Sequence, residues 1–290
     1  MPTGPRTRIT SESTIERRVV LMEPADIIVI DDPDDQRFGQ FRLNERGLAS
    51  RADKRDDAGA GMFLAEGDLV VERALDAACD PVAALVDVRR VPGVASRVIE
   101  AGAPVYAGGD EVRRVVSGLG MPQSIIALFR RPARPTVSEL AQHCRRLVIL
   151  EAVDNPANVG AIIRNAAGLG WDGLILDHTS ADPLARRSLR VAMGTAFALP
   201  HARTTTLADD IARLAGFELY AMTPDAAATP LGDVDAGDTA AVLIGSERSG
   251  LSDAVLDRAT PVRIPMGNGV DSLNAAAASA VACWELRRRG

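Results

Sequence analysis

Short apolar runs alternate with stretches of helical periodicity in the first half of the chain. Helical spacing of the apolar side chains predicts three helices, at residues 68–75, 94–101 and 110–117. Strands that alternate with helices predict a small α/β layer domain. The runs that predict its strands are residues 26–30, 62–65, 83–87, 104–106 and 125–128.

The same alternation restarts near residue 146. The continuous apolar character of its runs is typical of strands buried on both faces of a parallel sheet. Strands are predicted at residues 146–150, 173–176, 218–222, 240–244 and 262–264. Helices are predicted at residues 158–169, 185–191, 207–215, 251–259 and 272–288, with Gly170 just after the first of them. The last helix is rich in alanine, so it can approach a neighbouring helix closely.

A stretch rich in proline and arginine separates the two halves. Residues 130–135 read Arg-Arg-Pro-Ala-Arg-Pro and show no periodicity, so we expect a linker whose charges keep it in solvent. A chain of 290 residues is also long for one domain. We therefore predict a first domain in residues 1–130 with a polar amino-terminal extension, a linker in 131–139, and a second domain in 140–290.

Composition restricts the classes of partner. The net charge of −6 argues against binding nucleic acid over the whole surface, although a local basic patch remains compatible with it. Two groups of basic residues are equally consistent with a solvated helical face and with an RNA contact. They are Arg37, Arg42, Arg46, Arg51, Lys54 and Arg55, and then Arg186, Arg187 and Arg190.

Cysteine and histidine give no sign of a metal site. The three cysteines are far apart, and the three histidines have no ligand spacing, so we expect neither a metal nor a disulfide framework. No stretch approaches the length of about 20 apolar residues that a membrane span needs. The first 23 residues also lack the apolar core of a signal peptide. We expect a cytoplasmic protein without a membrane partner.

Three segments combine glycines with polar residues at the edges of apolar runs: residues 155–165, 243–251 and 264–274. Gly245 follows a predicted parallel strand, and in α/β folds ligands bind at the carboxyl ends of strands. Gly267 and Gly269 lie between the next strand and the last helix, and such glycines let the backbone come within hydrogen-bond range of a ligand. A dinucleotide site is excluded, because no Gly-x-Gly-x-x-Gly follows the first strand of this half.

The three segments resemble, in order and at the usual separations, the three motifs of the SpoU (TrmH) family of RNA 2′-O-methyltransferases in the SPOUT superfamily. The resemblance covers about residues 145–290. Residues 63–67 and the helix after them are similar to the L30e-like substrate-binding domain of that family. The resemblance implies an α/β fold with a trefoil knot in the second domain, S-adenosylmethionine as methyl donor, structured RNA (ribosomal by family analogy) as substrate, and a homodimer formed through the carboxyl-terminal domain.

Residue roles are carried over from these motifs. The resemblance places catalytic residues at Asn158, Arg164, Glu247, Ser272 and Asn274, and cofactor contacts at Met222, Thr223, Gly245, Ile264, Met266 and Leu273. Outside the motifs, the two groups of basic residues supply the expected RNA contacts, at Arg42, Arg46, Arg51, Arg186 and Arg187. Two positions depart from the motifs: Asn165 stands where Thr is frequent, and Arg248 where a small residue is common, so Arg248 can alter which RNA fits.

Proton removal from the ribose 2′-hydroxyl is the demanding step, because the hydroxyl is a weak nucleophile. The family mechanism assigns it to Arg164, but an arginine titrates above about 12.5, and neutralising it near pH 7 costs about 7 to 8 kcal/mol. We therefore expect Arg164 to hold the adjoining phosphate, and leave the general base open. Two other functions remain: a non-catalytic RNA-binding or ribosome-assembly protein on the same fold, and an antibiotic-resistance rRNA methylase.

Overall fold

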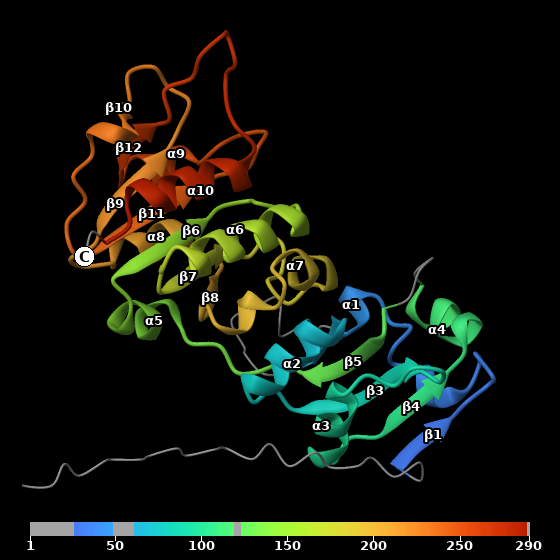
Figure 1. Ribbon diagram of the computed structural model, residues 1–290. Helices are drawn as coiled ribbons and strands as arrows, with labels where there is room; N and C mark the ends of the chain where they lie inside the picture. Colours follow the sequence, from blue (N-terminus) through green and yellow to red (C-terminus); the bar gives the residue numbers. More distant parts are fainter. Residues whose placement is uncertain (1–25, 49–60, 119–122, 289–290) are drawn as a thin grey trace, which may run out of the picture.

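The computed structural model describes residues 26–48, 61–118 and 123–288. The chain forms two α/β units, and each is built around one sheet (Figure 1). The first sheet belongs to residues before 131 and the second to residues after 145. The predicted division of the α/β fold into a small first half and a parallel-sheet second half is confirmed.

Five strands form the first sheet, in the order β1-β4-β3-β5-β2. They are β1 (Ile27–Val29), β2 (Met62–Glu66), β3 (Pro81–Asp87), β4 (Val105–Gly108) and β5 (Ile125–Arg130). Strands β1, β4 and β3 are parallel, whereas β5 runs antiparallel to both β3 and β2. One face packs against α2 (Asp68–Asp76) and α3 (Val94–Glu100). The other face packs against η2 (Gln36–Phe38), α1 (Glu45–Leu48) and α4 (Asp110–Ser117).

Seven parallel strands form the second sheet, in the order β10-β12-β9-β11-β6-β7-β8. They are β6 (Arg146–Leu150), β7 (Gly173–Asp177), β8 (His201–Thr204), β9 (Glu218–Met222), β10 (Thr229–Pro230), β11 (Ala240–Ile244) and β12 (Thr260–Arg263). Strands β6 and β11 lie near the centre and are buried throughout, as their continuous apolar runs predict. The trefoil threading implied by the resemblance stays a prediction.

Helices cover both faces of this sheet (Figure 1). On one face lie α5 (Val137–His143), α8 (Leu207–Ala212) and α9 (Asp253–Leu256). On the other lie α6 (Pro156–Gly168) and α10 (Ala275–Glu285), with α7 (Arg186–Val191) packed beside α6. Two short 3-10 helices, η4 (Thr195–Phe197) and η5 (Leu231–Asp233), complete the unit.

Helix α10 packs closely on α6, as its alanine content predicts. The Asn165 amide donates to the Ala276 carbonyl oxygen (2.9 Å) and to the Ser279 hydroxyl (3.0 Å). The indole of Trp171 donates to the Cys283 carbonyl oxygen at 2.9 Å. The side chain at Asn165, one of the two departures from the motifs, therefore ties the two helices together.

Strand β8 and helix α5 are among the elements that were not predicted. Strand β8 was missed because Ala202 is the only apolar residue among its four. Helix α5 begins inside the predicted linker, where Thr136 and Glu139 form a capping box: the Thr136 hydroxyl accepts from the Glu139 amide, and the Glu139 carboxylate accepts from the Thr136 amide. The reciprocal bonds satisfy backbone groups that would otherwise lack partners, so the helix starts directly after the prolines.

The expectation that the linker arginines stay in solvent is wrong for Arg131, which is only 7% exposed. Its guanidinium donates to the Met62 carbonyl oxygen (3.1 Å) in the first unit and pairs with Asp182 in the second. Burial acts to raise the pKa of Asp182, but Arg131, Arg203 and the Leu184 amide together outweigh it and hold that pKa at about 2. Arg131 is therefore a structural link between the two units.

A second ion pair joins the two units at Glu66, whose side chain is 1% exposed at the end of β2. The Arg186 guanidinium pairs with this carboxylate and donates to the Ser117 carbonyl oxygen at 2.7 Å. Arg190 lies 3.7 Å from the other carboxylate oxygen. From the sequence, Arg186 was equally consistent with an RNA contact and with a solvated face; in the structure it fixes α7 against the first unit.

Candidate functional site

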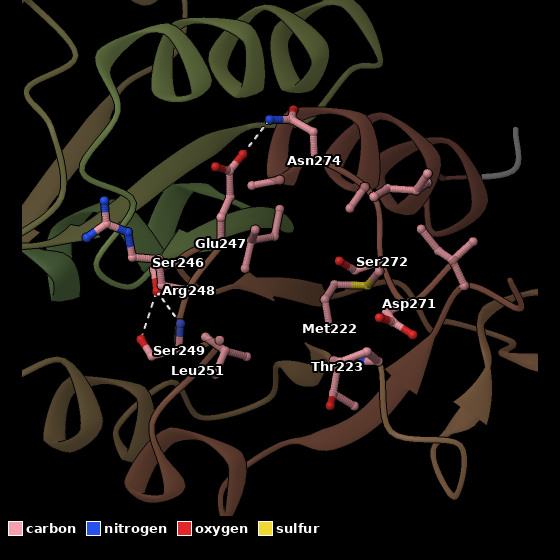
Figure 2. A pocket seen from close by; sticks show the side chains of 18 of the residues that line it. Met222, Thr223, Ser246, Glu247, Arg248, Ser249, Leu251, Asp271, Ser272 and Asn274 are labelled. Atoms are coloured by element: carbon pink, nitrogen blue, oxygen red, sulfur yellow. Dashed lines mark hydrogen bonds between the residues drawn. The ribbon is translucent and has the colours of Figure 1, made fainter. Parts of the chain in front are cut away.

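Two of the three predicted glycine segments, residues 243–251 and 264–274, line one cavity of about 640 Å³, whereas residues 155–165 are absent from its lining (Figure 2). The cavity lies at the carboxyl ends of three neighbouring strands: β9 ends at Met222, β11 at Ile244 and β12 at Arg263. Ligand sites in open α/β sheets occupy this edge. Segments from three separate parts of the chain thus meet where the sheet predicts a ligand.

All six residues predicted to contact a cofactor line this cavity. They are Met222, Thr223, Gly245, Ile264, Met266 and Leu273. Glu247, Ser272 and Asn274, predicted as catalytic, line it too. The lining combines apolar side chains with exposed backbone, which suits a small ligand that carries both apolar and polar groups.

Gly245 has no room for a side chain. A Cβ atom at this position would overlap the carbonyl carbon and oxygen of Gly250, which are backbone atoms and cannot rotate away. Gly250 itself adopts a φ of +68°, which closes the segment into a tight turn. The close approach of Gly245 to Gly250 therefore shapes one wall of the cavity.

Three side chains from distant segments form a hydrogen-bonded triangle at the cavity edge. Asn158 donates its amide to the Glu247 carboxylate (2.9 Å), and Asn274 donates to the same carboxylate oxygen and to the Asn158 amide oxygen (3.1 Å). Figure 2 shows Glu247 and Asn274 pointing toward each other. The predicted catalytic residues Asn158, Glu247 and Asn274 are therefore brought together.

Each member of the triangle is held by its own element. Asn158 lies in the first turn of α6 and is buried, with 7% exposure. Asn274 is the N-cap of α10, and its side-chain oxygen accepts from the Ala276 amide at 2.9 Å. The predicted helix start at residue 272 is thus three residues early, and Ser272 lies in the preceding loop. Because Asn274 caps α10, its amide group is fixed in the direction of Glu247.

Arg164 is not part of the cavity lining. It lies on α6, six residues after Asn158, and its side chain is exposed. Within the described residues it has no ion pair. Arg164 therefore lies outside the cavity lining and outside the triangle of Asn158, Glu247 and Asn274.

The arginines predicted to contact RNA have different surroundings. Arg187 is exposed on α7, whereas Arg186 pairs with Glu66. Arg42 is exposed and lies 3.3 Å from Asp34. The side chain of Arg46 and the whole of Arg51 lie outside the described residues.

Several residues that line the cavity were given no role at the site from the sequence. Leu256 and Ala278 come from helices α9 and α10, and only the fold could place them at the cavity. Ser246, Arg248 and Asp271 do lie within the glycine segments, where their polar character beside a glycine was the available signal.

Among the described residues, no group of three or more His, Cys, Asp or Glu side chains is arranged to hold a metal ion. None of the described helices has both the length and the apolar character that a membrane crossing needs.

The part of the chain that forms the second sheet and the cavity matches the model of a known family. The model of the SpoU rRNA Methylase family matches residues 145–284. An uncharacterized tRNA/rRNA methyltransferase of Mycobacterium bovis is 37% identical over 274 residues, which cover 91% of this chain and 93% of the relative. The chain belongs to the SpoU rRNA methylase family. The resemblance in the glycine segments is thereby confirmed at the level of the family, and the similarity to the mycobacterial protein extends across both units.

Two further rRNA methyltransferases are similar over most of the chain. The 23S rRNA (guanosine(2553)-2′-O)-methyltransferase RlmP of Bacillus subtilis is 27% identical over 238 residues, 81% of this chain and 92% of the relative. The crystal structure of an AdoMet-bound rRNA methyltransferase from Sinorhizobium meliloti superposes with a TM-score of 0.76 at 26% identity, and covers 90% of this chain and 97% of that protein.

Proposed function

We propose that this protein transfers the methyl group of S-adenosylmethionine to a ribose 2′-hydroxyl of RNA, and that the RNA is ribosomal. The observation that carries this proposal is the cavity at the ends of β9, β11 and β12, with the triangle of Asn158, Glu247 and Asn274 at its edge. The AdoMet-bound Sinorhizobium relative supports the cofactor, and the RlmP relative supports the acceptor. An RNA substrate of this kind implies action in the cytoplasm.

The residues present fit S-adenosylmethionine. A cavity of about 640 Å³ lies in the usual range for small-molecule sites. The missing side chain at Gly245 lets the backbone of Gly250 close against it and form one wall, while Met222, Ile264 and Leu273 supply apolar contact. When bound, the cofactor supplies a methyl group that its sulfonium has already activated. The chain therefore has to orient the acceptor rather than activate the donor.

The triangle and Arg164 orient the acceptor, the ribose 2′-hydroxyl. The two amides hold the Glu247 carboxylate in one position at the cavity edge, where it can accept a hydrogen bond from a ribose hydroxyl. Arg164 keeps the role of a phosphate clamp, because its guanidinium stays charged near pH 7. Its replacement by alanine is expected to abolish turnover and to spare cofactor binding; a loss of cofactor binding refutes the clamp.

A homodimer explains how Arg164 can act from outside the cavity. On α10, the helix packed on α6, Val281 is 36% exposed and Trp284 is 51% exposed. Apolar side chains of this size on one helix face favour association. A dimer formed through α6 and α10 brings Arg164 of one protomer toward the cavity of its partner. Light scattering at micromolar concentration tests this, and a monomer counts against it.

The decisive experiment has three parts. Calorimetry with S-adenosylmethionine and S-adenosylhomocysteine measures uptake of the cofactor. Incubation with labelled cofactor and with RNA from cells that lack the gene measures methyl transfer. Mapping of 2′-O-methyl sites in rRNA with and without the gene then identifies the nucleotide. Cofactor uptake and transfer support the proposal, whereas RNA binding without transfer favours a non-catalytic RNA-binding protein.

A further inference from the structure

The turn that carries Glu247 and Arg248 is rigid. The hydroxyls of Ser246 and Ser249 are 2.8 Å apart, and the Ser249 amide donates to the Ser246 hydroxyl at 3.1 Å. The Gly250 amide donates to the Ser246 carbonyl oxygen at 3.0 Å, which closes the turn. The two central side chains therefore leave the turn in fixed directions.

These two side chains point to different places. Glu247 is turned toward Asn274 and joins the triangle, whereas Arg248 extends away from Met222 and Thr223 (Figure 2). Arg248 nevertheless belongs to the lining and is exposed. Arg248 thus stands at the edge of the cavity, next to Glu247 in the chain, with an exposed side chain.

No acidic side chain neutralises this guanidinium. In residues 26–48, 61–118 and 123–288, no carboxylate lies within salt-bridge distance of Arg248. Glu247 is engaged by two amides. Glu151, across from the turn, accepts from the amide and the hydroxyl of Ser252, both at 2.7 Å. Both of these carboxylates accept from uncharged donors, and neither pairs with the exposed positive charge of Arg248.

We propose that Arg248 is a substrate-positioning residue that binds a backbone phosphate of the RNA next to the ribose held at Glu247. The inference rests on the proposed function, since it assigns the rim of the same site. A ribose 2′-hydroxyl is always flanked by phosphates, and these stay outside a cavity that admits the ribose. The planar guanidinium binds a phosphate through two parallel hydrogen bonds, which a lysine cannot reproduce. A charged residue here selects acceptors whose adjoining phosphate is accessible, as in a looped-out nucleotide.

The test compares Arg248→Ala, Arg248→Lys and a matched control, Arg145→Ala. Arg145 is also exposed, but it precedes β6 and so lies at the opposite edge of the sheet from the cavity. Binding to protein-free rRNA from cells that lack the gene is measured over a series of salt concentrations, and S-adenosylhomocysteine binding is measured by calorimetry. Arg248→Ala is expected to weaken RNA binding about tenfold, which equals about 1.4 kcal/mol. It should also reduce the slope of log K against log salt by about 0.7 to 0.9.

Arg248→Lys is expected to keep the salt slope and lose part of the affinity, while Arg145→Ala changes neither. Affinity for S-adenosylhomocysteine should stay within twofold in all three variants. Equal effects of Arg248→Ala and Arg145→Ala on RNA binding overturn the proposal, and so does a loss of S-adenosylhomocysteine binding in Arg248→Ala. If the wild type binds RNA through Arg248 but transfers no methyl, the proposed function fails and the phosphate contact stands.

Discussion

The side-chain amide of Asn158 donates to the carboxylate of Glu247 at 2.9 Å, although 89 residues separate the two in the chain. This bond joins the first turn of α6 to the turn that follows β11. Asn274 completes the contact from the N-cap of α10. One carboxylate thus sets the relative positions of three segments around the cavity, and its removal should affect the site more than the fold.

Replacement of Glu247 by alanine tests this relationship. The change leaves the amides of Asn158 and Asn274 without their shared acceptor. We expect methyl transfer to fall at least 100-fold, because the acceptor loses its orientation, while the free energy of unfolding falls by less than about 2 kcal/mol, since Glu247 is exposed. Turnover with labelled cofactor and urea unfolding measure the two effects. Glu247→Gln, which keeps one acceptor oxygen, serves as control, and unaltered turnover in Glu247→Ala contradicts the assigned role.

Strands could be predicted from the sequence where their own residues show a clear apolar pattern. Strands β6 and β11 were predicted with their observed ends, because strands buried on both faces must be apolar throughout. Strand β8 lies at the sheet edge and contains His201, Arg203 and Thr204, so its pattern does not differ from that of a loop. Pairing with β7 stabilises it as a strand, and this pairing depends on the tertiary structure rather than on the local sequence.

The site could be predicted where a close approach of two backbone segments requires a particular residue, such as glycine. Gly245 could be selected because only glycine fits so close to Gly250. Arg131 and Arg186, by contrast, look like any surface arginine in the sequence. Their burial depends on Asp182 and on Glu66, which lie 51 and 120 residues away along the chain. Long-range ion pairs of this kind leave no local pattern.

Two glycines of α6 should respond oppositely to alanine. A Cβ at Gly160 would overlap the Ser188 carbonyl oxygen of α7 and lie 3.0 Å from the Ser188 Cα, so Gly160→Ala must push the helices apart. We expect a loss of about 1 to 3 kcal/mol in the free energy of unfolding. At Gly168 nothing lies within 4 Å of the added Cβ, and Gly168→Ala should stabilise by about 0.4 to 1 kcal/mol. Urea unfolding measures both changes, and equal effects at the two sites would argue against the close α6–α7 contact.

Acid should destabilise the protein through His201. Burial lowers the pKa of this imidazole from 6.5 to about 4, although Asp182 opposes the effect. As the pH falls below 6.5, the unfolded chain takes up a proton that the folded chain refuses until about pH 4, so stability decreases across this window. The difference corresponds to at most about 3 kcal/mol.

Urea unfolding at pH 7 and pH 5 measures this dependence. His201→Gln should flatten it, because glutamine does not titrate. His143→Gln, at an exposed histidine, should leave it intact. A wild-type stability that does not change between these pH values would show that His201 titrates normally.

The ion pair between Glu66 and Arg186 should stabilise the contact between the two units. The Glu66 side chain is 1% exposed and that of Arg186 is 23% exposed, so removal of the carboxylate takes the opposite charge away from a largely buried cation. We expect Glu66→Ala to lower the free energy of unfolding by about 3 kcal/mol, the lower end of the range for buried pairs, because Arg186 keeps some contact with water. Arg187→Ala, on the exposed side of the same helix, should change it by less than about 0.5 kcal/mol.

Glu66→Leu combined with Arg186→Met should recover most of the loss, because the pair is replaced by apolar side chains of similar volume and no charge stays buried. Binding of S-adenosylhomocysteine should be unchanged in all these variants, since neither residue lines the cavity. Urea unfolding and calorimetry supply the two measurements. Should Glu66→Ala be no less stable than Arg187→Ala, the pair contributes nothing, and other contacts hold the units together, such as Arg131 with Asp182 and Phe63 with Phe197, at 5.6 Å between ring centres.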